Sequence, residues 1–333
     1  MFYYKIQIAT MPFQYVRYAR NPISNNHMNN FLKKSLLLVP AVFSTLFLSA
    51  QDNEESFKTF KEGGHYFITA SINGKTETPI MLESGIPALF VDSAFAASTG
   101  CVEISQYPSS DHKMNLNGRK FRITNEGDGK VRIGKQTIYE GPVFIMADYE
   151  NPYKVAVPIH LLHNEADGGS RIVKVDLAGE SLQILSRASL KETDKKDYIS
   201  HKITYKTYKN MPAVQSVLNL DEGGKVRSMK GKFYIDLGNA EVLFLVEKNK
   251  NVKKFLDSNP DMSLQEALAP NGAVVGRYVL TDKCTICDME FPDALVVVTP
   301  NFMGILPEGS IGLKFFNQHP AIMDFDKKRF YLK

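Results

Sequence analysis

Two acidic residues in this chain end apolar runs, and each is followed two positions later by a glycine. Glu83 lies in IMLESGIPALFV (residues 80–91), and Asp236 lies in FYIDLGNAEVLFLV (residues 233–246). A lone carboxylate in such a place usually marks a surface turn. Two carboxylates held close together are different, because they share one proton and can serve as a general acid and a general base. The elements around them decide whether they meet.

The segments around the two acids repeat in the same order: strand, turn, strand, acid, any residue, glycine, strand. The endings match as well, in VKVDLAGESLQIL and IMDFDKKRFYL, which place Asp176 93 residues after Glu83 and Asp324 88 residues after Asp236. Short alternating apolar runs bounded by Asn-Gly, Gly-Gly and Asp-Gly indicate a β-rich fold. The repeat therefore predicts a duplicated β-unit that brings one carboxylate per copy to a common interface.

This paired arrangement resembles the aspartic peptidases, specifically the bilobed pepsin-like and retropepsin-like group, here in an exported bacterial branch with degenerate ESG and DLG motifs. Members carry an apolar strand, then D-[ST]-G, then another apolar strand, once per lobe. The resemblance covers nearly everything after residue 60 and includes Ser310-Ile311-Gly312 as a later family element. It implies a mainly β, pepsin-like fold with two similar β-rich lobes from an internal duplication.

The resemblance also implies the roles of individual residues. Glu83 and Asp236 would form the catalytic dyad and activate a shared water to hydrolyse a peptide bond. Gly85 and Gly238 would let the backbone approach closely, and Ser84 would match the hydroxyl that bonds across to the opposite lobe. This chemistry needs no metal and no other cofactor.

Two positions depart from the family pattern. Glu83 is one methylene longer than the usual Asp, and Leu237 stands where the family has a hydroxyl. Two interpretations therefore remain open, a slow or specialised peptidase and a catalytically inactive relative that binds an extended peptide in the cleft between the lobes. A third, a duplicated β-sandwich without a cleft, would leave the two acids far apart.

The repeat also sets the predicted domain boundaries. We expect a first lobe at residues 51–187, a charged and strand-free linker at 188–200, and a second lobe at 201–333. The polar, turn-rich segment 106–134 is the predicted flap over the cleft, with Tyr107 and Phe121 as candidate flap aromatics and ordinary strand packing as the alternative for each. Helices are predicted within residues 246–259 and at 263–269.

The first fifty residues have the order of an export signal rather than of a domain. Residues 1–27 form an aromatic, polar leader, and from Met28 onward a basic pair, Lys33-Lys34, precedes an apolar run that ends at Ala50. This order is typical of a signal peptide over residues 28–50. It predicts a periplasmic or extracellular protein that begins near Gln51, with an uncleaved amino-terminal anchor as the alternative.

Charge and cysteine usage exclude several classes of function. The net charge of +4 arises before residue 51, and from there on the chain has 35 basic and 36 acidic residues. We therefore expect a peptide or protein substrate as partner, no nucleic acid and no stable membrane insertion after signal cleavage. Cys284 and Cys287 supply two ligands where structural zinc needs four, and in an exported chain they could instead form a disulfide, leaving Cys101 free.

Overall fold

The computed structural model describes most of the chain after residue 53. The described ranges are 54–116, 119–147, 153–193, 195–205, 211–268, 274–300 and 307–333. The predicted leader and signal peptide, residues 1–50, and the predicted mature terminus near Gln51 lie outside the described residues.

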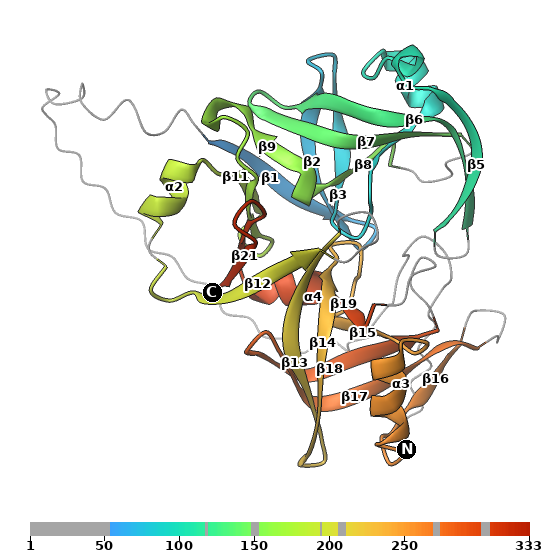
Figure 1. Cartoon of the computed structure of the whole chain (residues 1–333), viewed down its shortest axis with the longest axis vertical. Coiled ribbons are helices and arrows are strands. Elements are labelled where there is room, and N and C mark those ends of the chain that lie inside the picture. Colours follow the sequence, from blue (N-terminus) through green and yellow to red (C-terminus); the bar gives the residue numbers. More distant parts are fainter. Residues whose placement is uncertain are drawn as a thin grey trace, which may run out of the picture.

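The first half of the described chain builds a β-rich lobe, blue to green in Figure 1. Its elements are β1 (Glu55–Glu62), β2 (His65–Ile72), β3 (Thr76–Glu83), β4 (Leu89–Asp92), α1 (Ser93–Thr99), the 3-10 helix η1 (Ile104–Gln106), β5 (Ser109–Leu116), β6 (Arg119–Ile133), β7 (Thr137–Ala147), β8 (Val155–Pro158), η2 (Ile159–Leu161), β9 (Leu162–Asn164) and η3 (Glu165–Asp167). The turn between β2 and β3 holds Asn73 and Gly74, both at positive φ, which is the hairpin conformation these two residues favour.

One crossing in this lobe positions Glu83. Strands β3 and β4 follow each other along the chain, but β8 lies between them, parallel to β3 and antiparallel to β4. The chain that leaves β3 must pass the end of β8 to enter β4. Glu83 is the last residue of β3 and therefore stands where this crossing begins.

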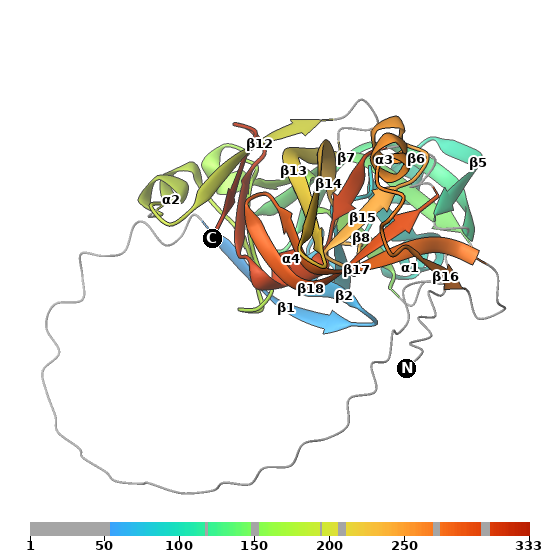
Figure 2. The same cartoon turned by 90° about the horizontal axis from the view of Figure 1, so that it is seen from below.

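The second lobe, yellow to red in Figure 1 and seen from below in Figure 2, repeats the plan. Its elements are β12 (Ile199–Tyr205), β13 (Pro212–Glu222), β14 (Lys225–Ile235), β15 (Leu243–Val246), α3 (Lys250–Asp257), β16 (Gln265–Leu268), β17 (Val274–Ile286), β18 (Met289–Thr299), β19 (Gly309–Ile311) and α4 (Leu313–Gln318). Here β19 lies between β14 and β15, parallel to the first and antiparallel to the second. Asp236 directly follows β14, so it begins the equivalent crossing.

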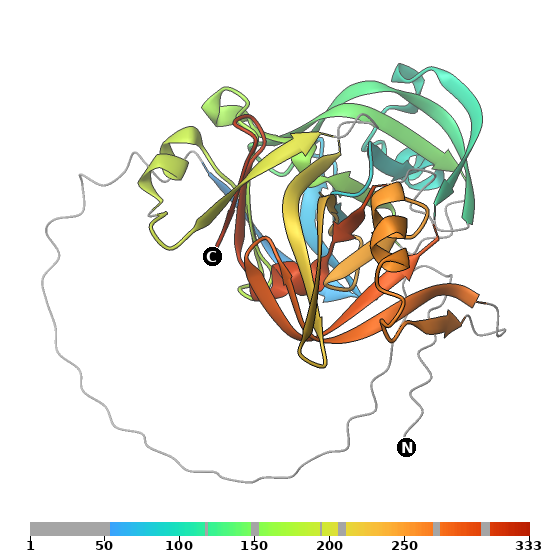
Figure 3. The ribbon, with the colours of Figure 1, turned by 60° about the horizontal axis from the view of Figure 1, so that its bottom comes forward.

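A third sheet joins the lobes. It is formed by β1 and β12 with two hairpins, one of β10 (Ile172–Asp176) and β11 (Ser181–Ile184), the other of β20 (Ala321–Asp324) and β21 (Arg329–Leu332). Its strand order is β1–β11–β10–β20–β21–β12, with the two hairpins back to back through the antiparallel pair β10 and β20. This order is symmetric about the β10–β20 pair, and Figure 3 shows the two lobes on either side.

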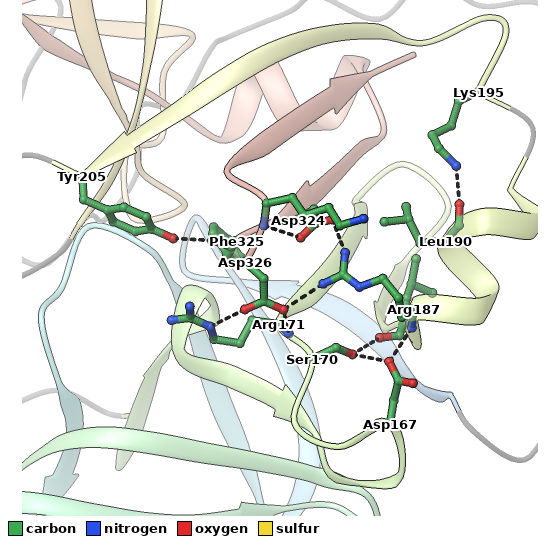
Figure 4. A network of polar contacts seen from close by, with 12 residues as sticks. Asp167, Ser170, Arg171, Arg187, Leu190, Lys195, Tyr205, Asp324, Phe325 and Asp326 are labelled. Carbon is green, nitrogen blue, oxygen red and sulfur yellow. Dashed lines mark hydrogen bonds and ion pairs between the residues drawn. The ribbon is translucent and has the colours of Figure 1, made fainter.

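Charged side chains reinforce this junction (Figure 4). Arg187 begins the short helix α2 (Arg187–Glu192) and donates to the buried carboxylate of Asp324 and, over 2.9 Å, to Asp326. Arg171 donates to Asp326 as well, from its backbone N–H over 3.0 Å and from its side chain over 2.9 Å. A buried carboxylate is stable only when it is paired, and this network pairs Asp324. It therefore ties the end of the first repeat to the β20–β21 turn.

Apolar side chains fill the inside of both lobes. One large cluster runs through the first lobe, the joining sheet and the second lobe, with members such as Ile68, Val173 and Phe233 fully buried. A second cluster covers the other face of the first lobe's sheet and includes Phe67 and Phe144. Burial of each such side chain contributes about 1.5–3 kcal/mol to folding.

Three local predictions can be compared with these elements. The helix predicted within 246–259 is confirmed by α3, whereas the helix predicted at 263–269 is wrong, because residues 265–268 form β16 and pair with β17. The segment 188–200 is not strand-free, since β12 begins at Ile199, and it also contains most of α2. The lobe boundaries at 187 and 201 stay predictions.

The predicted flap segment forms two paired strands. Strands β5 and β6 both lie entirely within residues 106–134, and they pair from Leu116 and Arg119 outward. Tyr107 lies buried in the large cluster and Phe121 in the second cluster, each about 6% exposed. Both aromatic rings therefore serve in core packing.

Candidate active site

The two acids are buried at the start of their crossings. Glu83 is paired with Pro158 of β8, and Glu83 is 7% exposed. The Asp236 N–H donates to the Ile311 carbonyl over 2.9 Å, and its residue is 5% exposed. The backbone of β8 therefore positions Glu83, and the backbone of β19 positions Asp236.

The two carboxylates lie beside each other at the interface of the lobes. A Cβ added to Gly238 would lie 2.5 Å from both carboxylate oxygens of Glu83, and a Cβ added to Gly85 would lie 2.5 Å from Oδ1 of Asp236. Each carboxylate thus occupies the space that a side chain on the opposite glycine would need. A duplicated sandwich with distant acids is excluded by this geometry.

Ser84 makes the hydrogen bond across the lobes that the resemblance implies. Its hydroxyl oxygen accepts from the Leu237 N–H over 2.9 Å in a buried position. Leu237 has no hydroxyl, so its side chain cannot accept the equivalent bond from the Ser84 N–H. The link between the two crossings is therefore one-sided. The structure brings together all five residues predicted for the site, namely Glu83, Ser84, Gly85, Asp236 and Gly238.

Asp236 has polar neighbours within its own lobe. The Gly238 N–H donates to Oδ1 of Asp236 over 3.1 Å, and the Ser310 side chain also bonds to this carboxylate. The Asn239 N–H donates to the backbone carbonyl of Asp236 over 3.2 Å. The side chain of Asn239 in turn donates to the Ser310 hydroxyl over 3.1 Å. Ser310 and Asn239 were not among the site residues predicted from the sequence. The available signal was a polar residue in an otherwise apolar position of the Ser310-Ile311-Gly312 element.

Glu83 has apolar neighbours at the equivalent positions. Ile86 stands three residues after Glu83, as Asn239 does after Asp236. Ala156 of β8 pairs with Met81, just as Ser310 of β19 pairs with Tyr234, two residues before each acid. Ile86, Ala156 and Met81 all belong to the second apolar cluster. Within the described residues, the first lobe thus has aliphatic groups where the second has hydrogen-bond donors.

These surroundings raise the pKa of both acids. Burial raises the pKa of Asp236 to about 6, although its hydrogen bonds with Gly238, Ser310 and Asn239 oppose the rise. Burial raises the pKa of Glu83 well above its ordinary value, and the charge of Asp236 raises it further, against hydrogen bonds from the backbone of Ser84 and Gly85. The negative charge of either acid therefore favours the protonated form of the other, so the two carboxyls titrate as a coupled pair.

The other candidate groups of the sequence do not join this site. Cys101, Cys284 and Cys287 are buried free thiols, and burial raises the pKa of Cys284 and of Cys287 to about 12. Within the described ranges, no three residues among His, Cys, Asp and Glu are grouped as metal ligands would be. In the same part of the chain, no helix has the length and apolar character to cross a membrane.

No known family model matches the sequence, and no curated protein is a detectable relative. Among solved structures the chain is similar to an aspartic proteinase from Irpex lacteus, at 10% identity and a TM-score of 0.49, over 84% of this chain and 96% of that one. It is also similar to Basic 7S globulin from soybean, at 10% identity and a TM-score of 0.48, over 84% of this chain and 95% of that one.

The predicted fold class is confirmed. The protein is mainly β, with a pepsin-like fold in which two similar β-rich lobes repeat one topology. The symmetric joining sheet and the two equivalent crossings are the features that define this repeat.

Proposed function

We propose that this protein is an exported, aspartic-peptidase-like hydrolase in which Glu83 and Asp236 cleave peptide bonds. The observation that supports the proposal is the interlocked pair of buried carboxylates, one from each lobe, each resting on the glycine of the opposite motif. Such a pair holds one proton between two acids, which is the state that general acid–base hydrolysis requires.

The different surroundings of the two acids suggest how they divide the work. Ionised Asp236 would take a proton from a water held between the carboxylates while the water oxygen attacks the peptide carbonyl carbon. Protonated Glu83 would donate its proton to the carbonyl oxygen. When the tetrahedral intermediate breaks down, Asp236 would donate the proton it took from the water to the amine nitrogen, the C–N bond breaks, and a hydroxyl of the intermediate would return a proton to Glu83 as the carboxyl product forms. The protons return to their starting distribution, so the dyad is ready for another cycle.

The proposed division predicts a peptidase that works near neutral pH. Asp236, with a pKa of about 6, must be ionised, and Glu83, with a pKa raised further by that charge, must keep its proton. The rate should therefore rise as pH increases through about 6 and fall again where Glu83 loses its proton. A plot of kcat/KM against pH with its maximum below pH 5 would contradict this assignment.

A buried histidine also favours a neutral working pH. Burial lowers the pKa of His160 to about 3, and within the described residues neither ring nitrogen has a hydrogen-bond partner. The unfolded chain takes up a proton on this residue below pH 6.5, whereas the folded chain does not until about pH 3. Folding stability should thus fall by about 1.4 kcal/mol per pH unit below 6.5 on account of this residue.

The alternative function is peptide binding without cleavage. It is favoured by Leu237, which removes one half of the hydrogen bonding between the crossings, and by the longer side chain of Glu83. A misplacement of about 1 Å can reduce a catalytic rate by about a hundredfold. In this case an extended peptide would bind between the lobes through its main chain and remain intact.

One experiment separates the two functions. A peptide library is incubated with the wild type, Asp236→Asn and Glu83→Gln between pH 4 and 9, and the products are identified by mass spectrometry. A peptidase should produce defined fragments with the wild type, and both variants should lose nearly all activity because neither can hold the shared proton.

Asp92→Asn is a suitable control variant. Asp92 is also a buried acid, and it is the last residue of β4. Its side chain caps the N-terminus of α1, a role that Asn fills equally well. Its cleavage pattern should match that of the wild type. Retention of intact peptides by all four proteins would support the binding function, and cleavage by Asp236→Asn at the wild-type rate would refute the dyad.

Export is part of the same proposal. The basic pair, apolar run and small residues of residues 28–50 support cleavage of a signal peptide near Gln51. Expression of the full chain in a Gram-negative host, followed by amino-terminal sequencing of the exported fraction, should give a terminus near Gln51. An intact start at residue 1 or 28 would show that the segment is retained.

A further inference from the structure

The surroundings of Asp236 contain a hydrogen-bond chain whose direction is fixed. Oδ1 of Asn239 accepts from the Glu241 N–H over 2.9 Å, which settles the orientation of this amide, since a backbone N–H can only donate. Its NH₂ group therefore points to Ser310 and donates to the carbonyl over 3.2 Å and to the hydroxyl oxygen over 3.1 Å. Asn239 and Ser310 are each 1% exposed, so water does not compete for these bonds.

The chain of bonds leaves the Ser310 hydroxyl one direction in which to donate. A hydroxyl has a single hydrogen, and the oxygen of Ser310 already accepts from Asn239. The hydrogen is therefore free for the Asp236 carboxylate, to which the Ser310 side chain is bonded. Hydrogen bonds donated to a charged carboxylate are stronger than those between neutral groups, so this bond favours the ionised form of Asp236.

The first lobe provides no such donor to Glu83 at the equivalent positions. Ala156 occupies the register position of Ser310, and Ile86 occupies that of Asn239. The titratable group that faces Asp236 across the interface is Glu83. On the second lobe's side, Glu241 is paired with Lys314, and Glu308 accepts from Asn251.

We propose that Ser310, oriented by Asn239, is a positioning residue that determines which acid of the pair ionises, so that Asp236 is the base and Glu83 the acid. The inference rests on the proposed function for its effect on catalysis, but the order of ionisation is a property of the folded protein alone. It assigns a role to the one polar residue of the Ser310-Ile311-Gly312 element.

The test measures the titration of the two carboxyl groups directly. In protein labelled with ¹³C at the Asp and Glu carboxyls, signals are assigned with Asp236→Asn and Glu83→Gln and followed from pH 3 to 10. In the wild type the earlier ionisation should belong to Asp236. Ser310→Ala should move it upward by about one to two pH units, the loss expected for one hydrogen bond to a charged group.

Matched variants separate this role from a structural one. Ser310→Thr keeps the hydroxyl and should give the wild-type titration. Asn239→Leu should raise the pKa of Asp236, as Ser310→Ala does. Ala156→Ser places a hydroxyl at the equivalent position of the first lobe and should lower the pKa of Glu83. Thermal unfolding of each variant checks that it is folded.

The titration tests the inference about Ser310, whereas the cleavage kinetics test the proposed function. An Asp236 ionisation unchanged in folded Ser310→Ala, or a wild type in which Glu83 ionises first, would overturn the inference. If the protein is a peptidase, the acidic limb of kcat/KM against pH should shift upward with Ser310→Ala and return with Ser310→Thr. Absence of any cleavage together with the expected titration would instead refute the proposed function and leave the inference standing.

Discussion

The two lobes of this protein share a topology and differ in what surrounds the acid. In the second lobe Asp236 is bonded to Gly238, Ser310 and Asn239. In the first lobe Glu83 is bonded to the backbone of Ser84 and Gly85, and the apolar residues Ile86 and Ala156 stand at the positions of Asn239 and Ser310. The backbone crossing that places each acid is the same. A duplicated backbone therefore fixes where two carboxylates lie, and only the side chains around them decide which one holds the proton.

The largest difference between the halves should appear in the pH dependence of stability. Burial raises the pKa of Asp236 from 3.8 to about 6, so the folded state binds this proton more tightly than the unfolded state. Stability is then lost as pH rises from about 4 to about 6 and stays lost above it. Asp236→Asn removes the loss and should stabilise the protein by about 3 kcal/mol above pH 6, and by almost nothing below pH 4.

Glu83→Gln should show a different pH profile. The pKa of Glu83 is raised well above its usual value by burial and by Asp236, so its destabilisation should continue to grow above pH 6, by about 1.4 kcal/mol per pH unit. Urea unfolding of both variants and the wild type from pH 4 to 8 measures the two curves. Superimposable curves would mean that the two acids do not differ as their surroundings indicate.

The next largest effect should come from filling the space beside either glycine. In Gly238→Ala the new Cβ meets the end of the flexible Glu83 side chain, which can rotate away. We expect the protein to keep its stability and its peptidase rate to fall by about a hundredfold, because the acid is misplaced.

Gly85→Ala should affect stability as well as rate. Its Cβ meets the Asp236 carboxylate, which is held in place by the Gly238 N–H and by Ser310. Because that carboxylate cannot move without losing these bonds, we expect about 1–3 kcal/mol of destabilisation. Rates and urea midpoints of the two Ala variants test the difference, and equal stability losses would contradict it.

A loss of stability of similar size is expected when the bond between the crossings is removed. Ser84→Ala leaves the buried Leu237 N–H without its side-chain acceptor, which should reduce stability by about 1–3 kcal/mol. Ser98→Ala, on the exposed surface of α1, serves as the control and should change stability by less than about 0.5 kcal/mol. Urea unfolding at pH 7 compares them, and equal losses would show that the bond across the lobes contributes nothing specific.

The smallest effect should come from making the two motifs more alike. Leu237→Thr removes apolar volume from the large cluster. The new Thr hydroxyl can accept from the Ser84 N–H, which would add the second hydrogen bond between the two crossings. The lost burial costs about 2 kcal/mol and the new bond returns about 1 kcal/mol, so a net loss of about 1 kcal/mol is expected. A much larger loss in urea unfolding would show that the new hydroxyl finds no partner.

The sequence was sufficient to predict the features that repeat. The two acids, their glycines, the Asn73-Gly74 turn and the matching hairpins around Asp176 and Asp324 are all local patterns, and the elements they indicate are present. Repetition strengthened each weak motif because both copies had to occur in the same order.

The features that depend on distant partners were not predicted. Residues 265–268 have a helical composition, yet they pair with β17, because tertiary pairing outweighs a small intrinsic propensity. Ser310 lies 74 residues after Asp236 and becomes a neighbour only through the parallel pairing of β14 with β19. No spacing in the sequence specifies that register.

The order of the joining sheet also has a consequence for how the chain folds. Strand β10 pairs with β20, whose residues come 152 positions later in the case of Ile172 and Asp324. While the protein is being synthesised, the first lobe therefore exposes the free edge of β10 until nearly all of the second lobe has been made. Contacts of such long sequence separation slow folding and leave strand edges open to pairing with other chains. The junction that unites the lobes in the finished protein is thus the last part of it to be protected from aggregation.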